Sequence, residues 1–192
     1  MNVCLYGASS DAIAKEYITA TEALGEYLAR QGHGLVYGGG GAGLMGAAAR
    51  GMSRGGGRII GVVPSFLQVD GILYDRCDEM IYTDTMRQRK QVMEERADAF
   101  IVTPGGIGTY EEFFEIYTLK QLGRHGKPIV IYNISGYYDQ LLAMLENTVA
   151  QGFMRAASLE LYTVADTPEQ ALAQMCAGCE TVDIRRTKFV KE

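Results

Sequence analysis

The residues best suited to chemistry lie between 104 and 112, where the chain reads PGGIGTYEE. A short apolar run over 99–102 precedes them and predicts a buried parallel strand. An amphipathic stretch follows them, with aromatic side chains at helical spacing. In a strand, glycine turn and helix arrangement, free backbone amides at the helix start can hold an anion, usually a phosphate. Glu112 would lie beside that anion, so the segment predicts chemistry on a phosphorylated small molecule.

Glu112 also has a purely structural interpretation. Thr109-x-x-Glu112 matches a capping box, in which both side chains bind free amides at a helix start. A second glycine cluster over 38–46 favours the catalytic interpretation, because it too follows an apolar strand and opens a helix. Ligands of open α/β sheets bind at the carboxyl ends of the strands, so the two loops are expected to face one crevice.

Three cations, Arg87, Arg89 and Lys90, fall at the start of a predicted helix over 86–97. Cations there oppose the helix dipole at about 0.3–1 kcal/mol each. One interpretation is a solvated charged face with pairs such as Lys90–Glu94. The other is an anionic ligand in the crevice, which arginine can bind with two parallel hydrogen bonds.

Standard nucleotide motifs are missing from the chain. There is no G-x-x-x-x-G-K-[ST], which argues against a P-loop kinase or ATPase. The first strand is followed by Gly7-Ala8-Ser9-Ser10-Asp11 rather than G-x-G-x-x-G, which argues against a standard NAD site. The hydroxyl groups of that turn are expected either to meet a ligand or to cap the next helix.

Strand and helix patterns alternate along the whole chain, which predicts the α/β class. The expected architecture is a Rossmann-like, doubly wound parallel sheet with helices on both faces. Strands are predicted over 2–7, 34–38, 58–63, 79–83, 99–102, 128–132 and 161–164. Helices are predicted over 12–31, 44–54, 86–97, 137–151 and 168–176, and another runs from the glycine turn to residue 122.

Length and composition fit one globular domain over 1–192 with a polar tail over 178–192. Hydrophobic residues make up 47% and charged residues 21%, as in an ordinary globular enzyme and unlike a disordered chain. The net charge of -5 argues against non-specific nucleic-acid binding. No apolar run reaches the roughly 20 residues of a membrane span, and no secretory signal is visible, so a cytoplasmic location is expected.

No metal or cofactor is expected. Cys176 and Cys179 form a C-x-x-C spacing, which is half of a zinc site. Only two histidines, His33 and His125, are present, so the other half is missing. The pair also follows a late helix, unlike a thioredoxin motif.

The segment PGGxGTxxE at 104–112 resembles the signature of the LONELY GUY (LOG) family, long misnamed lysine decarboxylases. Further blocks match in order along most of the chain. They are YGGG at 37–40 with GLMG at 43–46, GVVP at 61–64, M-x-x-RK at 86–90, QLG-x-H-x-KP at 121–128 and N-x-x-GYYD at 133–139.

The resemblance implies hydrolysis of a cytokinin riboside 5′-monophosphate, or of AMP, to the free base and ribose 5-phosphate. It places the family's essential arginine and glutamate on Arg89 and Glu112. Two departures leave the base open. Arg87 stands where the family commonly has histidine, and the stretch 65–70 lacks the acid that the family usually has soon after the proline at 64. The expected substrate-binding residues are Lys90, Gly105, Gly106, Ile107, Gly108, Thr109, Tyr110, Glu111 and Thr118, together with Ser9, Gly39 and Gly40 of the other turns.

Relatives in this family form dimers through helices near the active site, which implies a homodimer. The aromatic stripe of the helix after 106, and Met86 and Met93 of the preceding helix, suggest apolar faces that need cover. An alternative function is a carrier of a phosphorylated cofactor, because molybdenum-cofactor carrier proteins share the fold and similar glycine loops. The intact Arg89 and Glu112 favour the enzyme.

Overall fold

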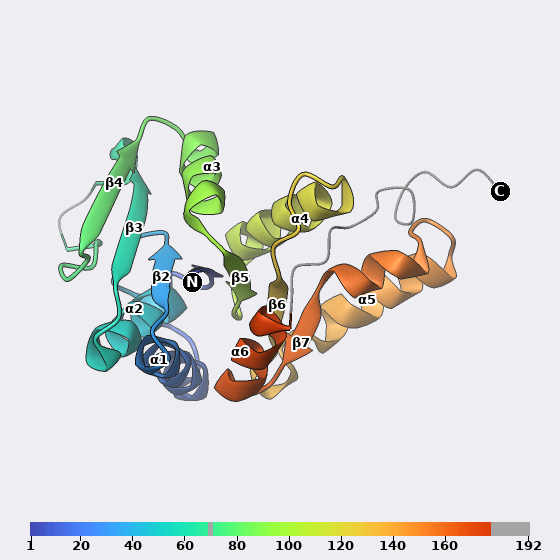
Figure 1. Ribbon diagram of the computed structural model, residues 1–192, viewed down its shortest axis with the longest axis horizontal. Coiled ribbons are helices and arrows are strands. Elements are labelled where there is room, and N and C mark those ends of the chain that lie inside the picture. Colours follow the sequence, from blue (N-terminus) through green and yellow to red (C-terminus); the bar gives the residue numbers. More distant parts are fainter. Residues whose placement is uncertain (69–70, 178–192) are drawn as a thin grey trace.

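A computed structural model describes residues 1–68 and 71–177 (Figure 1). The predicted polar tail and Cys179 lie outside these residues. The chain forms one seven-stranded, all-parallel sheet with the order β4-β3-β2-β1-β5-β6-β7. Its strands are β1 (Asn2–Tyr6), β2 (Gly34–Tyr37), β3 (Ile59–Pro64), β4 (Glu79–Thr83), β5 (Ala99–Val102), β6 (Ile129–Tyr132) and β7 (Thr163–Ala165).

Helices cover both faces of the sheet, so the predicted doubly wound parallel fold is confirmed. Figure 1 shows α1, α2 and α6 on one face, with α3 and α4 on the other. The helices are α1 (Lys15–Arg30), α2 (Gly43–Gly55), α3 (Met86–Arg96), α4 (Ile107–Gln121), α5 (Asp139–Ala150) and α6 (Pro168–Cys176), with 3-10 turns at η1 (Ser65–Leu67), η2 (Ile134–Gly136) and η3 (Ala156–Leu161).

The central strand β1 is apolar on both sides because each face of the sheet carries its own core. Val3 and Leu5 pack with residues of α1, α2 and α6. Cys4 and Tyr6 point to the other face and pack with residues of α3, α4 and α5. Burial of this kind positions the helices that carry Arg89 and Glu112.

The aromatic stripe of α4 belongs to this second core. Phe113 and Tyr117 are buried, and so is Met93 of α3. The expectation that these side chains form an uncovered apolar face is therefore wrong. They are covered by the chain's own sheet and by η3, whose Ser158 carbonyl accepts a hydrogen bond from the Tyr117 hydroxyl at 3.0 Å.

The order of the strands reverses between β1 and β5, which pair in parallel with Tyr6 opposite Val102. The loops that follow these two strands are therefore neighbours at the carboxyl edge of the sheet. The Ala8 amide donates to the Pro104 carbonyl at 3.0 Å. This switch point is where open α/β sheets bind ligands, as the sequence predicted for the glycine loops.

Several predicted boundaries are off by one to three residues, and the starts of α1 and β7 are two examples. Helix α1 begins at Lys15 rather than at residue 12, with Ala14 as an N-cap that has no side-chain bond. The last strand covers 163–165 instead of 161–164, because Ala156–Leu161 turns as a 3-10 helix before it. Among the described helices, none combines the length and the apolar character needed to cross a membrane.

Candidate active site

A buried ion pair lies at the centre of the site. Arg89 of α3 and Glu112 of α4 are 7% and 9% exposed, and Arg89 Nη1 donates to Glu112 Oε1 at 2.8 Å. Arg89 Nε also donates to the Val62 carbonyl of β3 at 3.2 Å. The pair therefore joins two helices to the carboxyl end of a strand. The structure brings together the two residues predicted to be catalytic.

Gly38, directly after β2, leaves room for this arginine. A Cβ atom at Gly38 would overlap the Arg89 Nη2 atom, so only glycine fits without moving the guanidinium. Sequence reasoning marked the glycine cluster but did not include Gly38 among the site residues. Gly38 and Arg89 are far apart in the sequence, so the spacing of residues along the chain does not reveal their contact at the sheet edge.

The capping-box interpretation of Glu112 is wrong. Helix α4 begins at Ile107 with Gly106 as its N-cap, and no side chain caps it. Glu112 therefore lies in the second turn, past the free amides, and its carboxylate contacts Arg89. Burial raises the pKa of Glu112, and the Arg89 guanidinium opposes this rise. A carboxylate with a raised pKa is a stronger base than an exposed one.

The start of α4 offers a set of open backbone donors. Gly106, Ile107 and Gly108 are exposed. In the part of the chain that the structure describes, no hydrogen bond engages their amides or that of Thr109. Thr109 is buried against Gly105, where a Cβ atom would overlap its hydroxyl. Unbonded amides at a helix start, with the dipole behind them, form an anion site.

The second glycine cluster, over 38–46, offers no such open donors at the start of α2, because in the described chain the amides there are already hydrogen-bonded. Gly43, the first residue of α2, donates to Asp11 Oδ1 at 2.8 Å, and Leu44 donates to the Ala8 carbonyl at 2.8 Å. A carboxylate of the chain itself therefore lies at the positive end of α2. Both glycine loops lie at the same edge, but only α4 presents open amides.

Other predicted contacts surround these loops. Ser9 is exposed, and Ser10 accepts from the Ala12 amide at 3.1 Å instead of capping α1. The Gly39 carbonyl accepts from the Tyr74 amide at 2.9 Å, and Gly40 forms a bridge with Leu73. Ligand binding by Ser9, Gly39 and Gly40 stays a prediction.

Lys90 lies between α3 and α4, with its side chain 14% exposed. Its ammonium group pairs with the Glu111 carboxylate and, at 2.7 Å, with Glu115, rather than with Glu94 as the charged-face interpretation suggested. Burial lowers the pKa of Lys90, but the two carboxylates outweigh it and leave the pKa raised. These side chains line a hollow of about 470 Å³ between α3 and α4.

The predicted site residues therefore divide into two groups. Arg89, Glu112 and the loop 105–109 form the inner group at the sheet edge. Lys90 and Glu111 form a second group at the hollow between α3 and α4, and Thr118 is exposed on α4. Tyr110 is half-buried, with its ring edge-on to Tyr138 at 6.1 Å.

The segment after α4 ties α3 and α4 together. Lys127 Nζ donates to the Glu94 carbonyl of α3 at 2.6 Å. His125 Nε2 lies 2.8 Å from the Ile116 carbonyl of α4, and it must carry the proton because a carbonyl oxygen only accepts. Burial lowers the pKa of His125, which favours this neutral form. The QLG-x-H-x-KP block thus has a structural role that sequence reasoning missed.

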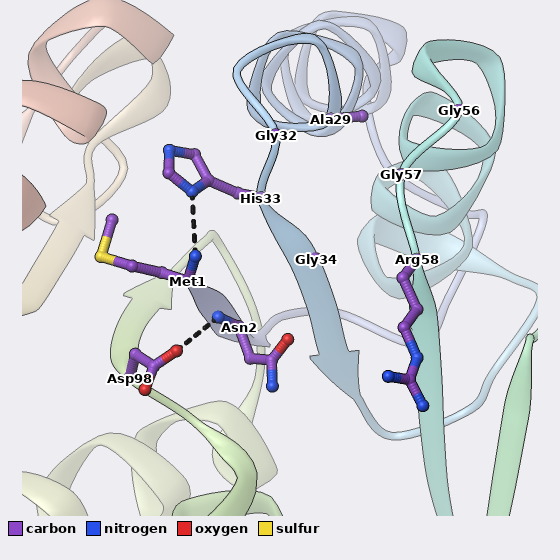
Figure 2. Close-up of a pocket in the computed structure, with 10 residues that line it drawn as sticks. All are labelled: Met1, Asn2, Ala29, Gly32, His33, Gly34, Gly56, Gly57, Arg58 and Asp98. Carbon is purple, nitrogen blue, oxygen red and sulfur yellow. Dashed lines mark hydrogen bonds between the residues drawn. The ribbon is translucent and has the colours of Figure 1, made fainter.

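A separate hollow of about 350 Å³ lies at the opposite, amino edge of the sheet (Figure 2). In Figure 2 the Met1 amino group points to His33 Nδ1 at 3.3 Å, and the Asn2 amide binds Asp98. No residue of the predicted site lines it. In the described ranges, no group of three or more His, Cys, Asp or Glu residues could hold a metal ion.

Comparison with known proteins gives a family match over residues 45–175, to a sequence model described as "Possible lysine decarboxylase". A cytokinin riboside 5′-monophosphate phosphoribohydrolase of Mycobacterium tuberculosis is 41% identical over 175 residues, which are 91% of this chain and 92% of the relative. A probable enzyme of the same name from Oryza sativa subsp. japonica is 38% identical over 173 residues, 90% of this chain and 70% of the relative.

Solved structures show the same fold at lower identity. A molybdenum cofactor carrier protein of Chlamydomonas reinhardtii has a TM-score of 0.71 and 22% identity, covering 92% of this chain and 98% of its own. A molybdenum cofactor binding protein of Rippkaea orientalis has a TM-score of 0.66 and 23% identity, covering 90% and 91%. Likeness at this level concerns the fold alone.

The buried pair predicts a pH-dependent loss of stability in Arg89→Met. The change removes the guanidinium that lowers the pKa of Glu112, so that pKa should rise further above its value in the unfolded chain. At neutral pH the unpaired carboxylate should cost about 3–5 kcal/mol of unfolding free energy. The loss should shrink as the pH falls through the folded pKa, because a protonated Glu112 needs no partner.

Urea unfolding at a series of pH values measures this effect. The matched control is Arg89→Met with Glu112→Gln, which removes both charges and should recover much of the stability at neutral pH. A loss in Arg89→Met that is the same at every pH would contradict the account of Glu112.

Proposed function

The chain belongs to the LONELY GUY (LOG) family, and from that premise we propose that it hydrolyses the N-glycosidic bond of a nucleoside 5′-monophosphate. The products would be a free base and ribose 5-phosphate. The observation that supports this most directly is the buried Arg89–Glu112 pair next to the open amides of α4. A cytokinin riboside 5′-monophosphate and AMP are the substrates that we propose.

In the proposed reaction the 5′-phosphate binds to the amides at the start of α4. The C1′–N bond breaks with its electron pair going to the base, which takes up a proton, while a water oxygen bonds to C1′. Positive charge that develops on the ribose is stabilised by ionised Glu112, as carboxylates do in other glycoside hydrolyses. Glu112 also accepts a proton from the attacking water.

Arg89 has two proposed roles in this scheme. Its contact at 2.8 Å holds Glu112 in one orientation, and its charge favours the ionised carboxylate. Its position against Gly38 and the Val62 carbonyl fixes the guanidinium at the sheet edge. From there it can also bind anionic or ribose groups of the substrate.

Incubation with AMP tests the activity and separates it from the carrier function. An enzyme of the proposed kind releases ribose 5-phosphate, which a reducing-sugar assay detects, whereas a carrier binds without releasing sugar. The same assay over a panel of nucleotides and cytokinin ribotides identifies the base. Absence of sugar release from every nucleotide would contradict the proposal.

The role of Glu112 predicts a large effect of Glu112→Gln on turnover. This change keeps the size of the side chain and removes the charge, so kcat should fall about 100-fold or more through lost electrostatic stabilisation. Thermal unfolding should change less than in Arg89→Met, because the buried guanidinium loses its counter-charge but keeps two hydrogen-bond acceptors, the new amide oxygen and the Val62 carbonyl. A variant that loses stability but keeps its rate would show that Glu112 is only structural.

The amides of α4 predict strong selectivity for the phosphate. Adenosine lacks the dianion and so loses several charge-assisted hydrogen bonds, each worth about 1.5–3 kcal/mol. Its kcat/KM should be at least about 1,000-fold below that of AMP under identical conditions. Part of this loss should appear in kcat, because the phosphate contacts also position the ribose. Equal rates on both substrates would contradict phosphate binding at this loop.

We also propose that the protein is a homodimer with residues of both subunits near each crevice. Met86 and Ile107, the first residues of α3 and α4, are 39% and 86% exposed although both are apolar. Thr118, which the family resemblance assigns to the substrate, is exposed on α4. Residues there could meet a nucleotide bound by the other subunit.

Sedimentation velocity at micromolar concentration tests the dimer. Met86→Glu places a charge at the start of α3 and should shift the equilibrium toward the monomer. Phe153→Asp is the matched control, because Phe153 is equally apolar and 88% exposed but follows α5. A wild-type monomer at this concentration would contradict the proposal.

A cytoplasmic setting is part of the same proposal. Cys4, Cys77 and Cys176 are free thiols in the described part of the chain. Free thiols are typical of proteins that work in a reducing compartment.

A further inference from the structure

The turn after β6 packs against the loop that we propose binds phosphate. It corresponds to the N-x-x-GYYD block, to which neither the sequence nor the mechanism above assigns a role. Asn133 braces the turn, since its Oδ1 accepts from the Tyr138 amide at 2.7 Å and its Nδ2 donates to Asp139 at 2.8 Å. Ser135 has a φ of 52°, which is uncommon for a residue with a side chain. Strain of this kind persists only where the surroundings enforce it.

Two adjacent tyrosines of this turn reach two carbonyl groups of the loop. The Tyr137 hydroxyl donates to the Gly105 carbonyl at 2.7 Å. The Tyr138 hydroxyl donates to the Thr103 carbonyl at 2.7 Å. The two bonds are alike in donor, acceptor and length.

The consequences of the two bonds differ because of the residues that follow each carbonyl. In a trans peptide the C=O and the next N–H point in opposite directions, and the described chain has no cis peptide. The bond from Tyr137 therefore turns the Gly106 amide away from Tyr137. The bond from Tyr138 orients no donor at all, because the residue after Thr103 is Pro104, which has no N–H.

The peptide that Tyr137 holds is also the one most able to rotate. It joins Gly105 to Gly106, and two glycines in succession allow backbone conformations that other residues resist. A reversed peptide would point the Gly105 carbonyl, with its partial negative charge, to the side where the amide now points. An anion bound there would be repelled.

We propose that Tyr137 is a positioning residue that holds the Gly105–Gly106 peptide with its amide toward the 5′-phosphate. The inference rests on the proposed function, since it takes the start of α4 as the phosphate site. Tyr137 does not touch the reacting atoms. It determines whether one amide of the phosphate loop is available before the substrate arrives.

The surroundings of Tyr137 suit this role. Its ring packs edge-on against Tyr17 at 6.0 Å and against Tyr138 at 5.0 Å, which fixes the direction of the hydroxyl. Partial burial and the neighbouring Tyr110 raise the pKa of Tyr137 to about 12, so the hydroxyl remains a donor at working pH. Tyr137 is 38% exposed, so phenylalanine fits there without a new cavity.

The matched pair Tyr137→Phe and Tyr138→Phe tests the inference, because each removes one hydroxyl that binds one loop carbonyl. Calorimetric titration with ribose 5-phosphate measures binding, and kcat/KM for AMP and for adenosine measures the contribution of the phosphate. Tyr137→Phe should weaken ribose 5-phosphate binding about 10-fold or more, the loss expected for one charge-assisted hydrogen bond. It should lower kcat/KM for AMP by a similar factor and leave that for adenosine unchanged.

Tyr138→Phe should behave differently. Tyr138 is fully buried, and the loss of its hydroxyl leaves the Thr103 carbonyl without a hydrogen-bond partner. The Tm of this variant should therefore fall. Its affinity for ribose 5-phosphate and its ratio of kcat/KM for AMP over adenosine should stay close to the wild type. Equal effects of the two variants on both quantities, or no effect of Tyr137→Phe, would overturn the inference.

Binding and turnover separate this inference from the proposed function. If the wild type binds ribose 5-phosphate but cleaves no nucleotide, the proposed function fails. The role of Tyr137 is then tested by binding alone, and Tyr137→Phe should still weaken the affinity for ribose 5-phosphate by the same factor. If the wild type does not bind ribose 5-phosphate, the phosphate site itself is wrong and the inference is overturned with it.

Discussion

The buried pair of Arg89 and Glu112 is the interaction on which the rest of the site depends. Two charges removed from water are tolerated only when each remains in contact with the other and with further polar groups. Arg89 meets that requirement through Glu112 and the Val62 carbonyl. The pair therefore constrains α3, α4 and β3 together. Gly38 leaves space for the guanidinium, and Lys127 and His125 tie the segment after α4 to both helices.

The proposed anion site depends on the backbone rather than on charged side chains. Carbonyl groups of residues 103–105 are bonded to Tyr138, Ala8 and Tyr137, while the amides at the start of α4 have no bond in the described structure. At α2 the chain's own Asp11 occupies the equivalent position. Two glycine-rich turns of similar sequence therefore differ in what they offer a ligand, and the difference comes from the loop after β1.

Several features followed directly from the sequence. The alternation of strands and helices predicted the doubly wound sheet, and the glycine turns predicted which edge would carry the site. The family resemblance singled out Arg89 and Glu112 as the essential residues, and the structure brings the two together at that edge. The segment 104–112 also matched a capping box, which is wrong because α4 begins at Ile107 and not after Thr109. A helix boundary shifted by three residues separates the two interpretations, and local spacing does not determine it.

By itself, the sequence determined the fold class, the edge of the sheet that carries the glycine loops and the residue types available there for chemistry, because hydrophobic period and turn residues are local properties. Only the tertiary structure decided which amides are open, which face of α4 is covered and which partner each charge finds. Phe113 and Tyr117 lie in the core, Lys90 pairs across to α4, and Tyr137 binds a carbonyl 32 residues away in the chain. Such contacts join segments that are distant along the chain, so their geometry exists only once the sheet has brought its strand ends together.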